Sequence, residues 1–297
     1  MGLWRATVGV VFAAIAVSCT SDAAPPPEPT TSTSQTSTST TSTTLPVVTP
    51  PPGYQLVWRD EFAGGELDRS KWNVEHSTFG DGGNTLHCYV PDAVEVGGGV
   101  LVLTGERRQM TCPNGSTRAF TSGMVTGEGL ATFRYGWFEV RARVPEGRGL
   151  WPAIWMSPND DVYGPWPASG EIDLMEVRGD RPRTARVNIH FLDVFDKRVQ
   201  NPHDTTASPG SGFSEQFHTF GLRWEPHRMV FMIDGLEVHS IENWASSVGP
   251  GDAPFDQEFF FRLNLAIGGD YPGSPDDGTP WPARFEIDWV RVFQSQG

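Results

Sequence analysis

Three carboxylic side chains lie close together in the stretch SGEIDLMEVRG, residues 169–179, with a spacing that could support acid–base chemistry. Successive side chains of a strand point to opposite faces, so Glu171 and Asp173 share one face and Glu176 should point away. One extra residue, a β-bulge near Met175, would return Glu176 to that face. The spacing therefore predicts a bulged strand with three carboxylates in one row and apolar residues behind them.

Two other interpretations of the acidic row stay open. An exposed edge strand favours lysine and mixed charges rather than carboxylates that alternate with isoleucine and leucine. Calcium binds several carboxylates, but calcium loops are usually rich in turns, whereas this segment is strand-like. Carboxylates on one face repel each other, which raises the pKa of at least one of them. Such an unfavourable electrostatic free energy is typical of functional sites. We therefore favour an acid–base site.

Two carboxylates with separate roles suit the hydrolysis of a glycosidic bond. One attacks the anomeric carbon and the other protonates the leaving oxygen; a separation of about 5–5.5 Å gives retention of configuration. Side chains on one bulged strand can converge to that distance, and Asp173 could then hydrogen-bond the nucleophile. A sugar site also needs flat apolar platforms. The chain has 11 tryptophans, of which Trp151, Trp155 and Trp166 lie just upstream of the acidic strand.

The elements that must position these residues are predicted to be strands. In RYGWFEVRARV, residues 134–144, apolar and polar residues alternate with a period of two, and Asp234-Gly235 marks the turn of a hairpin. Glycine (33) and proline (25) interrupt these runs too often for long helices, and no alternation of strands and helices is seen. The pattern predicts an all-β fold: a jelly-roll sandwich of two curved antiparallel sheets with a concave substrate cleft.

The 297-residue chain divides into three parts. Residues 1–18 are typical of an export signal, and the small residues before Cys19 resemble a bacterial lipobox, in which that cysteine is lipidated. Cleavage near Ala23 or Ala24, as in an ordinary secretory signal, is the alternative. Residues 19–52 are rich in Ser, Thr and Pro and predict a disordered tether. Residues 53–297 form one domain, so we expect an exported or lipid-anchored surface protein.

Charge and cysteine content limit the partners. The net charge of −14 disfavours nucleic acid and anionic membrane surfaces and suits a neutral polysaccharide, so membrane contact is expected only through the lipid anchor. Cys88 and Cys112 are expected to pair in an oxidising compartment, which would stabilise the fold by about 3 kcal/mol. We expect a monomer.

The residues Glu171–Glu176 resemble the bulged signature of glycoside hydrolase family 16, in the form typical of laminarinase-like endo-β-1,3-glucanases. Further segments resemble the family in the same order, namely 56–62, 67–72, 120–123, 149–156, 263–269 and 287–292. The resemblance implies a β-jelly roll and a retaining mechanism. It also implies that Glu171 is the nucleophile, Glu176 the general acid/base and Asp173 the assisting carboxylate.

The resemblance extends to other positions of the cleft. Trp166 matches the tryptophan that stacks beside the scissile bond, while substrate-lining positions are matched by Trp151, His190, Asn84 and Asn264. The segment 82–89 departs from the run common in laminarinases, and the expected Cys88–Cys112 bridge would sit beside the loop that borders the donor side of the cleft, which leaves the exact substrate open.

Many members of the family bind one structural calcium ion. Glu61, the carbonyl of Gly99 and Asp288 match that pattern, and no cofactor is expected for catalysis. Each of the two carboxylates also has an ordinary interpretation, as a turn residue and as an outward strand residue.

The predicted function is therefore an endo-acting, retaining hydrolase of β-1,3-glucan. A transglycosylase, or a hydrolase of mixed-linkage glucan or galactan, is an alternative within the same fold. A glucan-binding protein without activity is a further alternative, although such binders typically lose one or both glutamates, and both are present here.

Overall fold

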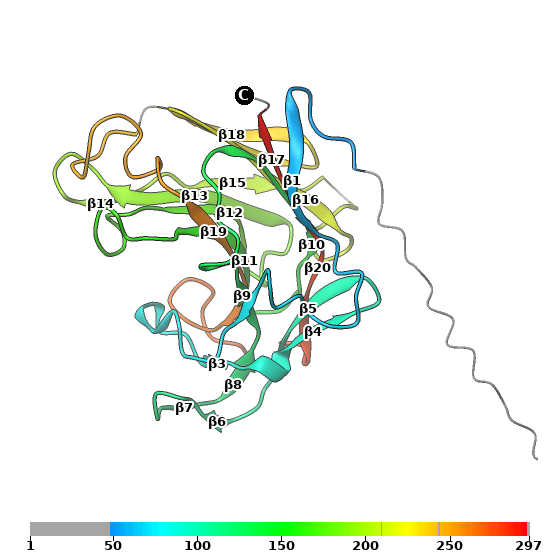
Figure 1. The fold of residues 1–297 in the computed structure, drawn as a ribbon. Helices are drawn as coiled ribbons and strands as arrows, with labels where there is room; N and C mark the ends of the chain where they lie inside the picture. Colours follow the sequence, from blue (N-terminus) through cyan, green and yellow to red (C-terminus); the bar gives the residue numbers. More distant parts are fainter. Residues whose placement is uncertain (1–47, 209, 243, 296–297) are drawn as a thin grey trace, which may run out of the picture. The chain divides into compact units, whose positions relative to one another are not determined.

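The computed structural model describes residues 48–208, 210–242 and 244–295 (Figure 1). The predicted signal, Cys19 and most of the predicted tether lie outside the described residues. Within the described ranges, no helix is long and apolar enough to cross a membrane.

Two large antiparallel sheets make up the fold. The first sheet runs in the order β18-β17-β16-β10-β20-β5-β4, with β1 paired to β20. Its strands are β1 (Tyr54–Asp60), β4 (Val94–Gly97), β5 (Val100–Gly105), β10 (Gly136–Arg143), β16 (His218–Glu225), β17 (Arg228–Ile233), β18 (Leu236–Glu242) and β20 (Ala283–Ser295).

The second sheet runs in the order β14-β13-β12-β11-β19-β9-β2, with β15 paired to β13. Its strands are β2 (Asn73–Val74), β9 (Met124–Thr126), β11 (Leu150–Pro158), β12 (Glu171–Val177), β13 (Thr184–Leu192), β14 (Arg198–Gln200), β15 (His203–Thr206) and β19 (Phe259–Ile267). Neighbours that are distant in sequence, such as β11 and β19, show that the topology is not a simple meander. The all-β sandwich predicted from the sequence is confirmed.

Short elements complete the described part of the chain. Two small strand pairs are formed by β3 (His87–Tyr89) with β8 (Phe120–Ser122), and by β6 (Met110–Thr111) with β7 (Thr117–Arg118). The two short helices are η1 (Asp81–Gly83) and η2 (Pro91–Ala93). The predicted disulfide is present: Cys88 on β3 is bonded to Cys112, with 5.9 Å between the Cα atoms.

Alternating burial explains how the sheets pack. Along β10, buried and partly exposed residues alternate without interruption, as expected of a strand with one face on the core. The main core is a large cluster between the sheets, to which β12 contributes Ile172, Leu174 and Met175, and a second, small cluster surrounds the disulfide. The opposite face of the second sheet carries its polar residues, and it is this face that holds the acidic row.

Candidate active site

A bulge in β12 brings the three carboxylates to one face of the second sheet. Asp173 pairs with Asn188 and Glu176 with Arg186, so β12 uses three steps where β13 uses two. The extra residue falls at Leu174 and Met175, both of which point into the core. The bulge predicted near Met175 is therefore confirmed, and it restores Glu176 to the face of Glu171 and Asp173.

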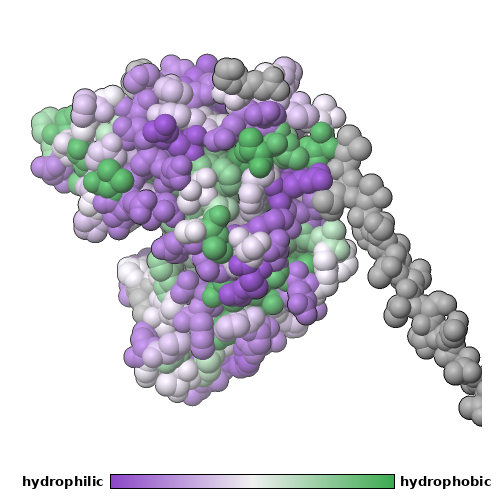
Figure 2. Space-filling model, in the orientation of Figure 1, coloured by the Kyte–Doolittle hydropathy of each residue, from purple (hydrophilic) through white to green (hydrophobic). Residues whose placement is uncertain are grey.

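The side chains of the acidic row are largely shielded from solvent although they point away from the core. Asp173 is only 3% exposed, and Asn264 on the same face is 6% exposed. Glu171 and Glu176 are half-buried. The surface is hollowed between the part that carries β13 and β14 and the part that carries β3 and β8 (Figure 2). A polar face that is both screened and hollowed is suited to hold a polar ligand away from bulk water.

Two tryptophans hydrogen-bond the two glutamates. The indole Nε1 of Trp166 donates to Glu171 Oε2 at 2.7 Å. On the other side of the row, Trp151 Nε1 donates to Glu176 Oε1 at 3.1 Å. Trp166 is 50% exposed, so its ring is available to a ligand while its N–H orients the carboxylate. The structure thus brings both predicted tryptophans to the acidic row.

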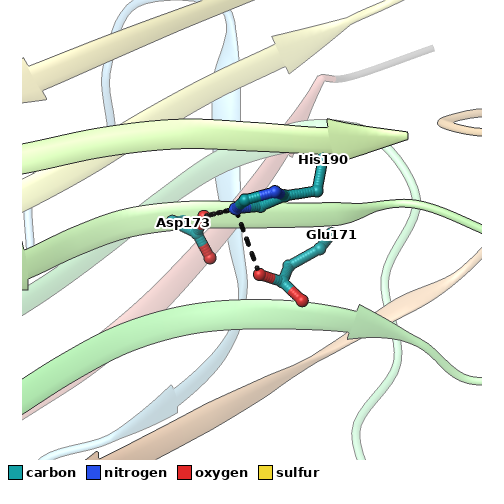
Figure 3. Close-up of side chains that lie close together, drawn as sticks. All are labelled: Glu171, Asp173 and His190. Atoms are coloured by element: carbon teal, nitrogen blue, oxygen red, sulfur yellow. Dashed lines mark ion pairs between the residues drawn. The ribbon is translucent and has the colours of Figure 1, made fainter. Parts of the chain in front are cut away.

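His190 stands over the same row on the neighbouring strand β13 (Figure 3). Its Nε2 lies 3.5 Å from Glu171 Oε1 and 3.3 Å from Asp173 Oδ2. Asn188 Nδ2 lies 2.9 Å from the same ring nitrogen. The site residue His190, predicted from the resemblance, therefore bridges two of the three carboxylates.

Burial raises the pKa of all three carboxyl groups. It raises the pKa of Glu171 to about 8, with repulsion from Asp173 as the second cause. It raises the pKa of Glu176 to about 7, to which the charge of Glu171 adds. The pKa of Asp173 is also well above its usual range, because of burial and the charge of Glu176. Interacting carboxyl groups titrate as a set, so the row holds protons near neutral pH.

Similar neighbours favour the ionised form of both glutamates. The N–H of Trp166 and the ring of His190 act to lower the pKa of Glu171 against the effect of burial. The ring of His190, the charge of Arg186 and the N–H of Trp151 act to lower the pKa of Glu176 in the same way. Once a proton sits elsewhere in the row, these neighbours favour the anion at either glutamate.

The arrangement argues against calcium at the acidic row. Glu171, Asp173 and His190 each place one ligand atom within 4.8 Å of the others. Calcium takes oxygen ligands, and an imidazole nitrogen in the middle of the set does not suit it. The surface-edge interpretation fails as well, because β12 lies between β11 and β13.

The two predicted asparagines lie farther from the row. Asn264 on β19 accepts a hydrogen bond from Trp155 Nε1 at 2.7 Å and donates to the hydroxyl of Tyr89 at 3.0 Å. It thus belongs to the polar face. Asn84 donates to both oxygens of Asp270, at 3.0 and 3.1 Å. Asn84 is therefore held by a residue of the loop that follows β19.

Sequence reasoning missed two groups that surround Glu176. Arg186 is paired across the strands with Glu176, and it is held by Asp204 through bonds of 2.7 and 3.1 Å. The ring of Tyr271 lies 5.1 Å from the ring of Trp151, and the Arg186 guanidinium lies 5.2 Å from the Tyr271 ring. The positive charge of Arg186 lowers the pKa of Glu176 against the effect of burial. The regular alternation on β13 could have indicated Arg186, whereas nothing local marks Tyr271.

The residues predicted to bind calcium have other partners. Both oxygens of Glu61 accept hydrogen bonds from Arg291, at 2.9 and 2.8 Å, and Asp288 pairs with Arg141. Gly99 lies in the turn between β4 and β5. Since an arginine neutralises each carboxylate, this set does not fit a divalent cation as arranged.

Comparisons with known proteins agree with this geometry. The family model described as Glycosyl hydrolases family 16 matches residues 71–291. A glucan endo-1,3-beta-glucosidase of Cryptopygus antarcticus is 37% identical over 250 residues, covering 80% of this chain and 91% of that protein. The glucan endo-1,3-beta-glucosidase A1 of Niallia circulans is 34% identical over 82% of this chain, which spans 38% of that longer protein.

A solved structure shares the fold over the same part of the chain. The endo-beta-1,3-glucanase from Pyrococcus furiosus has a TM-score of 0.73 and 32% sequence identity, covering 82% of this chain and 95% of its own. The family match extends over most of the chain and includes the whole acidic row. The chain belongs to family 16 of the glycosyl hydrolases.

Proposed function

We propose that this protein is a retaining, endo-acting hydrolase of β-1,3-glucan. The observation that carries the proposal is the bulged strand β12, which sets two half-buried glutamates on one face with a tryptophan N–H on each. The relatives from Cryptopygus antarcticus and Niallia circulans are named glucan endo-1,3-beta-glucosidases, which supports β-1,3-glucan as the substrate class.

The proposed reaction proceeds by two displacements. Glu171 attacks the anomeric carbon while Glu176 donates its proton to the glycosidic oxygen, so the bond to the leaving sugar breaks as the glycosyl–enzyme ester forms. Glu176, now ionised, then takes a proton from water, which attacks the same carbon and releases Glu171. Two inversions give net retention. Asp173, with His190 above it, keeps Glu171 oriented. When Asp173 is protonated, it places no negative charge beside Glu176.

A mixed-linkage glucan is the second candidate substrate. A structure 35% identical to this chain, with a TM-score of 0.73, is described as a non-specific endo-beta-1,3(4)-glucanase. The hydrolases of the two linkages therefore share this fold, and the substrate must be tested directly.

A polysaccharide panel tests the proposed substrate. We expect the protein to release reducing ends from laminarin and curdlan, because the relatives are named for the 1,3 linkage. Lichenan, agarose, carrageenan and a galactan complete the panel. Cleavage of lichenan alone would indicate that the substrate is a mixed-linkage glucan and not a β-1,3-glucan. Cleavage of the galactan alone would refute a glucanase. Glucan binding without any cleavage would favour the non-catalytic alternative.

We further propose that the protein is exported and anchored by a lipid on Cys19, and that it acts as a monomer. Cys19 follows the apolar run of the predicted signal. Changing Cys19→Ala should move the protein from the membrane fraction to the soluble fraction after cell lysis and ultracentrifugation. Equal partitioning of the variant and the parent would refute the anchor, and a dimer mass in light scattering would refute the monomer.

A further inference from the structure

Phe79 is an exposed aromatic ring that the fold holds firmly. The residue is 42% exposed and lies in the loop before η1. We propose that Phe79 is a stacking platform for a β-glucosyl unit of the substrate distant from the cleaved bond, and that Arg262 positions it. This inference rests on the proposed function and adds a subsite to it.

The register of the second sheet places this platform in line with the acidic row. Asp173 on β12 pairs with Trp155 on β11, and Trp155 pairs with Arg262 on β19. Arg262 pairs in turn with Thr126 on β9. Neighbouring strands are about 4.8 Å apart, so Arg262 lies roughly 10 Å from the acidic row on the same face. A polymer that crosses the strands of this face therefore passes from Asp173 towards Arg262.

Arg262 is an unusual residue for its position. It is only 9% exposed in a strand whose nine residues are all buried. Its Nε donates to Ser157 Oγ at 2.9 Å, and one terminal nitrogen lies 3.5 Å from Glu128 Oε2. A buried cation is costly unless its partners offset the loss of water. Such a cost suggests a role beyond packing.

The role that the contacts indicate is support of Phe79. The Arg262 guanidinium lies 4.6 Å from the centre of the Phe79 ring, 4.7 Å from that of Phe260 and 5.4 Å from that of Trp155. The rings of Phe79 and Trp155 are 6.0 Å apart and inclined by 32°. A guanidinium attracts aromatic faces. Arg262 thus fastens the ring of Phe79 to the face of the sheet next to Trp155.

The loop around Phe79 is fixed from its other side as well. The Oγ of Thr78 accepts a hydrogen bond from Asn114 Nδ2 at 2.8 Å, and Asn114 lies just after Cys112 of the disulfide. The carbonyl of Ser77 accepts a bond of 2.8 Å from the N–H of Tyr89. These hydrogen bonds hold the loop in position while the outer side of the Phe79 ring stays exposed.

A ligand for this platform must offer a flat apolar surface. All ring substituents of a β-glucosyl unit are equatorial, so its faces present C–H groups that can pack on an aromatic ring. A phenyl ring has no hydrogen-bonding group of its own, so it binds the sugar face rather than a particular hydroxyl. Because the platform is distant from the acidic row, only chains long enough to reach it should benefit.

Two measurements test the platform. The first is migration in gels that contain laminarin, with Glu171→Gln as the parent so that the polymer is not consumed. Adding Phe79→Ala should weaken retardation by about tenfold in Kd. The second is kcat/KM of the active protein on laminari-oligosaccharides of increasing length. Phe79→Ala should lower kcat/KM about tenfold on the longest chains and leave the shortest cleaved chain unchanged.

Matched variants separate stacking from folding. Phe217 is a partly exposed ring with two arginines, Arg141 and Arg143, each 5.1 Å from it, and it precedes β16 of the first sheet. Phe217→Ala should leave both readouts unchanged. Phe79→Tyr keeps a flat ring and should retain long-chain preference, whereas Phe79→Leu should lose it.

The role of Arg262 is tested by Arg262→Met, which keeps length but removes the charge. It should reproduce the long-chain loss, and the double variant with Phe79→Ala should be no worse than either single variant. Additive losses would refute a positioning role. Equal loss on all chain lengths, or no loss on long chains, would overturn the platform.

Failure of the platform differs from failure of the proposed function. If the unmodified protein cleaves laminarin and Phe79→Ala changes nothing, only the platform is wrong. If the unmodified protein cleaves no β-1,3-glucan, the proposed function is wrong, and the gel then decides the platform alone: no retardation of the parent by laminarin would overturn it.

Discussion

Changing Glu171→Gln should lower the turnover of β-1,3-glucan by on the order of 10⁴-fold or more, because the amide cannot form the glycosyl–enzyme ester. Glutamine has nearly the same shape as glutamate, so glucan binding should persist. The substitution also removes one of three carboxyl groups that are buried in the same row. The melting temperature should therefore stay the same or rise, as is common where a strained active site is relaxed.

Glu139→Gln is the matched control for this variant. Glu139 on β10 of the first sheet is also half-buried, and it accepts a hydrogen bond from Trp137 Nε1 at 2.9 Å. It belongs to the other sheet and lies on the face of β10 that points away from the core, so its substitution should leave turnover unchanged. Initial rates on laminarin and thermal unfolding of the two variants make the comparison. Turnover of Glu171→Gln within tenfold of the unmodified protein would contradict the assigned role.

Removing the acid, by contrast, should produce a loss that depends on the leaving group. Changing Glu176→Ala should lower kcat/KM on laminarin by about 10²–10⁴-fold, the usual contribution of a general acid. An aryl β-glucoside with an acidic phenol as leaving group needs no proton, so its first displacement should be almost unaffected. A burst of phenol followed by slow turnover is expected, because the second displacement still needs a base.

The pH profile gives an independent test of Glu176. Burial raises its pKa to about 7, so its proton is present below that pH and is lost as the pH rises through it. For the unmodified protein, kcat/KM on laminarin should fall on the alkaline side. For Glu176→Ala with the aryl glucoside, that alkaline decrease should disappear. Its persistence would show that another group is the acid.

The catalytic strand could be predicted from the sequence because its signal is local. The alternation of carboxylates with Ile172 and Leu174 fixed one face, and the extra step before Glu176 required a bulge. Strand β12 shows both features. The pairing of Cys88 with Cys112 could be predicted because no third cysteine lies in the folded part.

The rest of the site depends on contacts between distant segments. Phe79 meets Arg262 only because β19 lies beside β11 and the loop before η1 folds over that face. The pairing of Arg291 with Glu61, which leaves the predicted calcium ligands poorly suited to the ion, likewise joins the two ends of the domain. No local pattern shows such contacts, although an arginine inside the apolar run FFFRLNLAI could have been recognised as a polar residue with a special role.

The most direct test of the proposed mechanism is azide rescue of a Glu171→Gly variant on an activated aryl β-laminaribioside. Glycine leaves space on the side from which the nucleophile would attack, and azide can enter it. If Glu171 is the nucleophile, azide should restore release of the phenol and proton NMR should show an α-glycosyl azide, with inverted configuration. A β-glycosyl azide would contradict the account, because it would place Glu171 in the role of acid/base. If the variant kept normal activity without azide, Glu171 would have no part in the reaction.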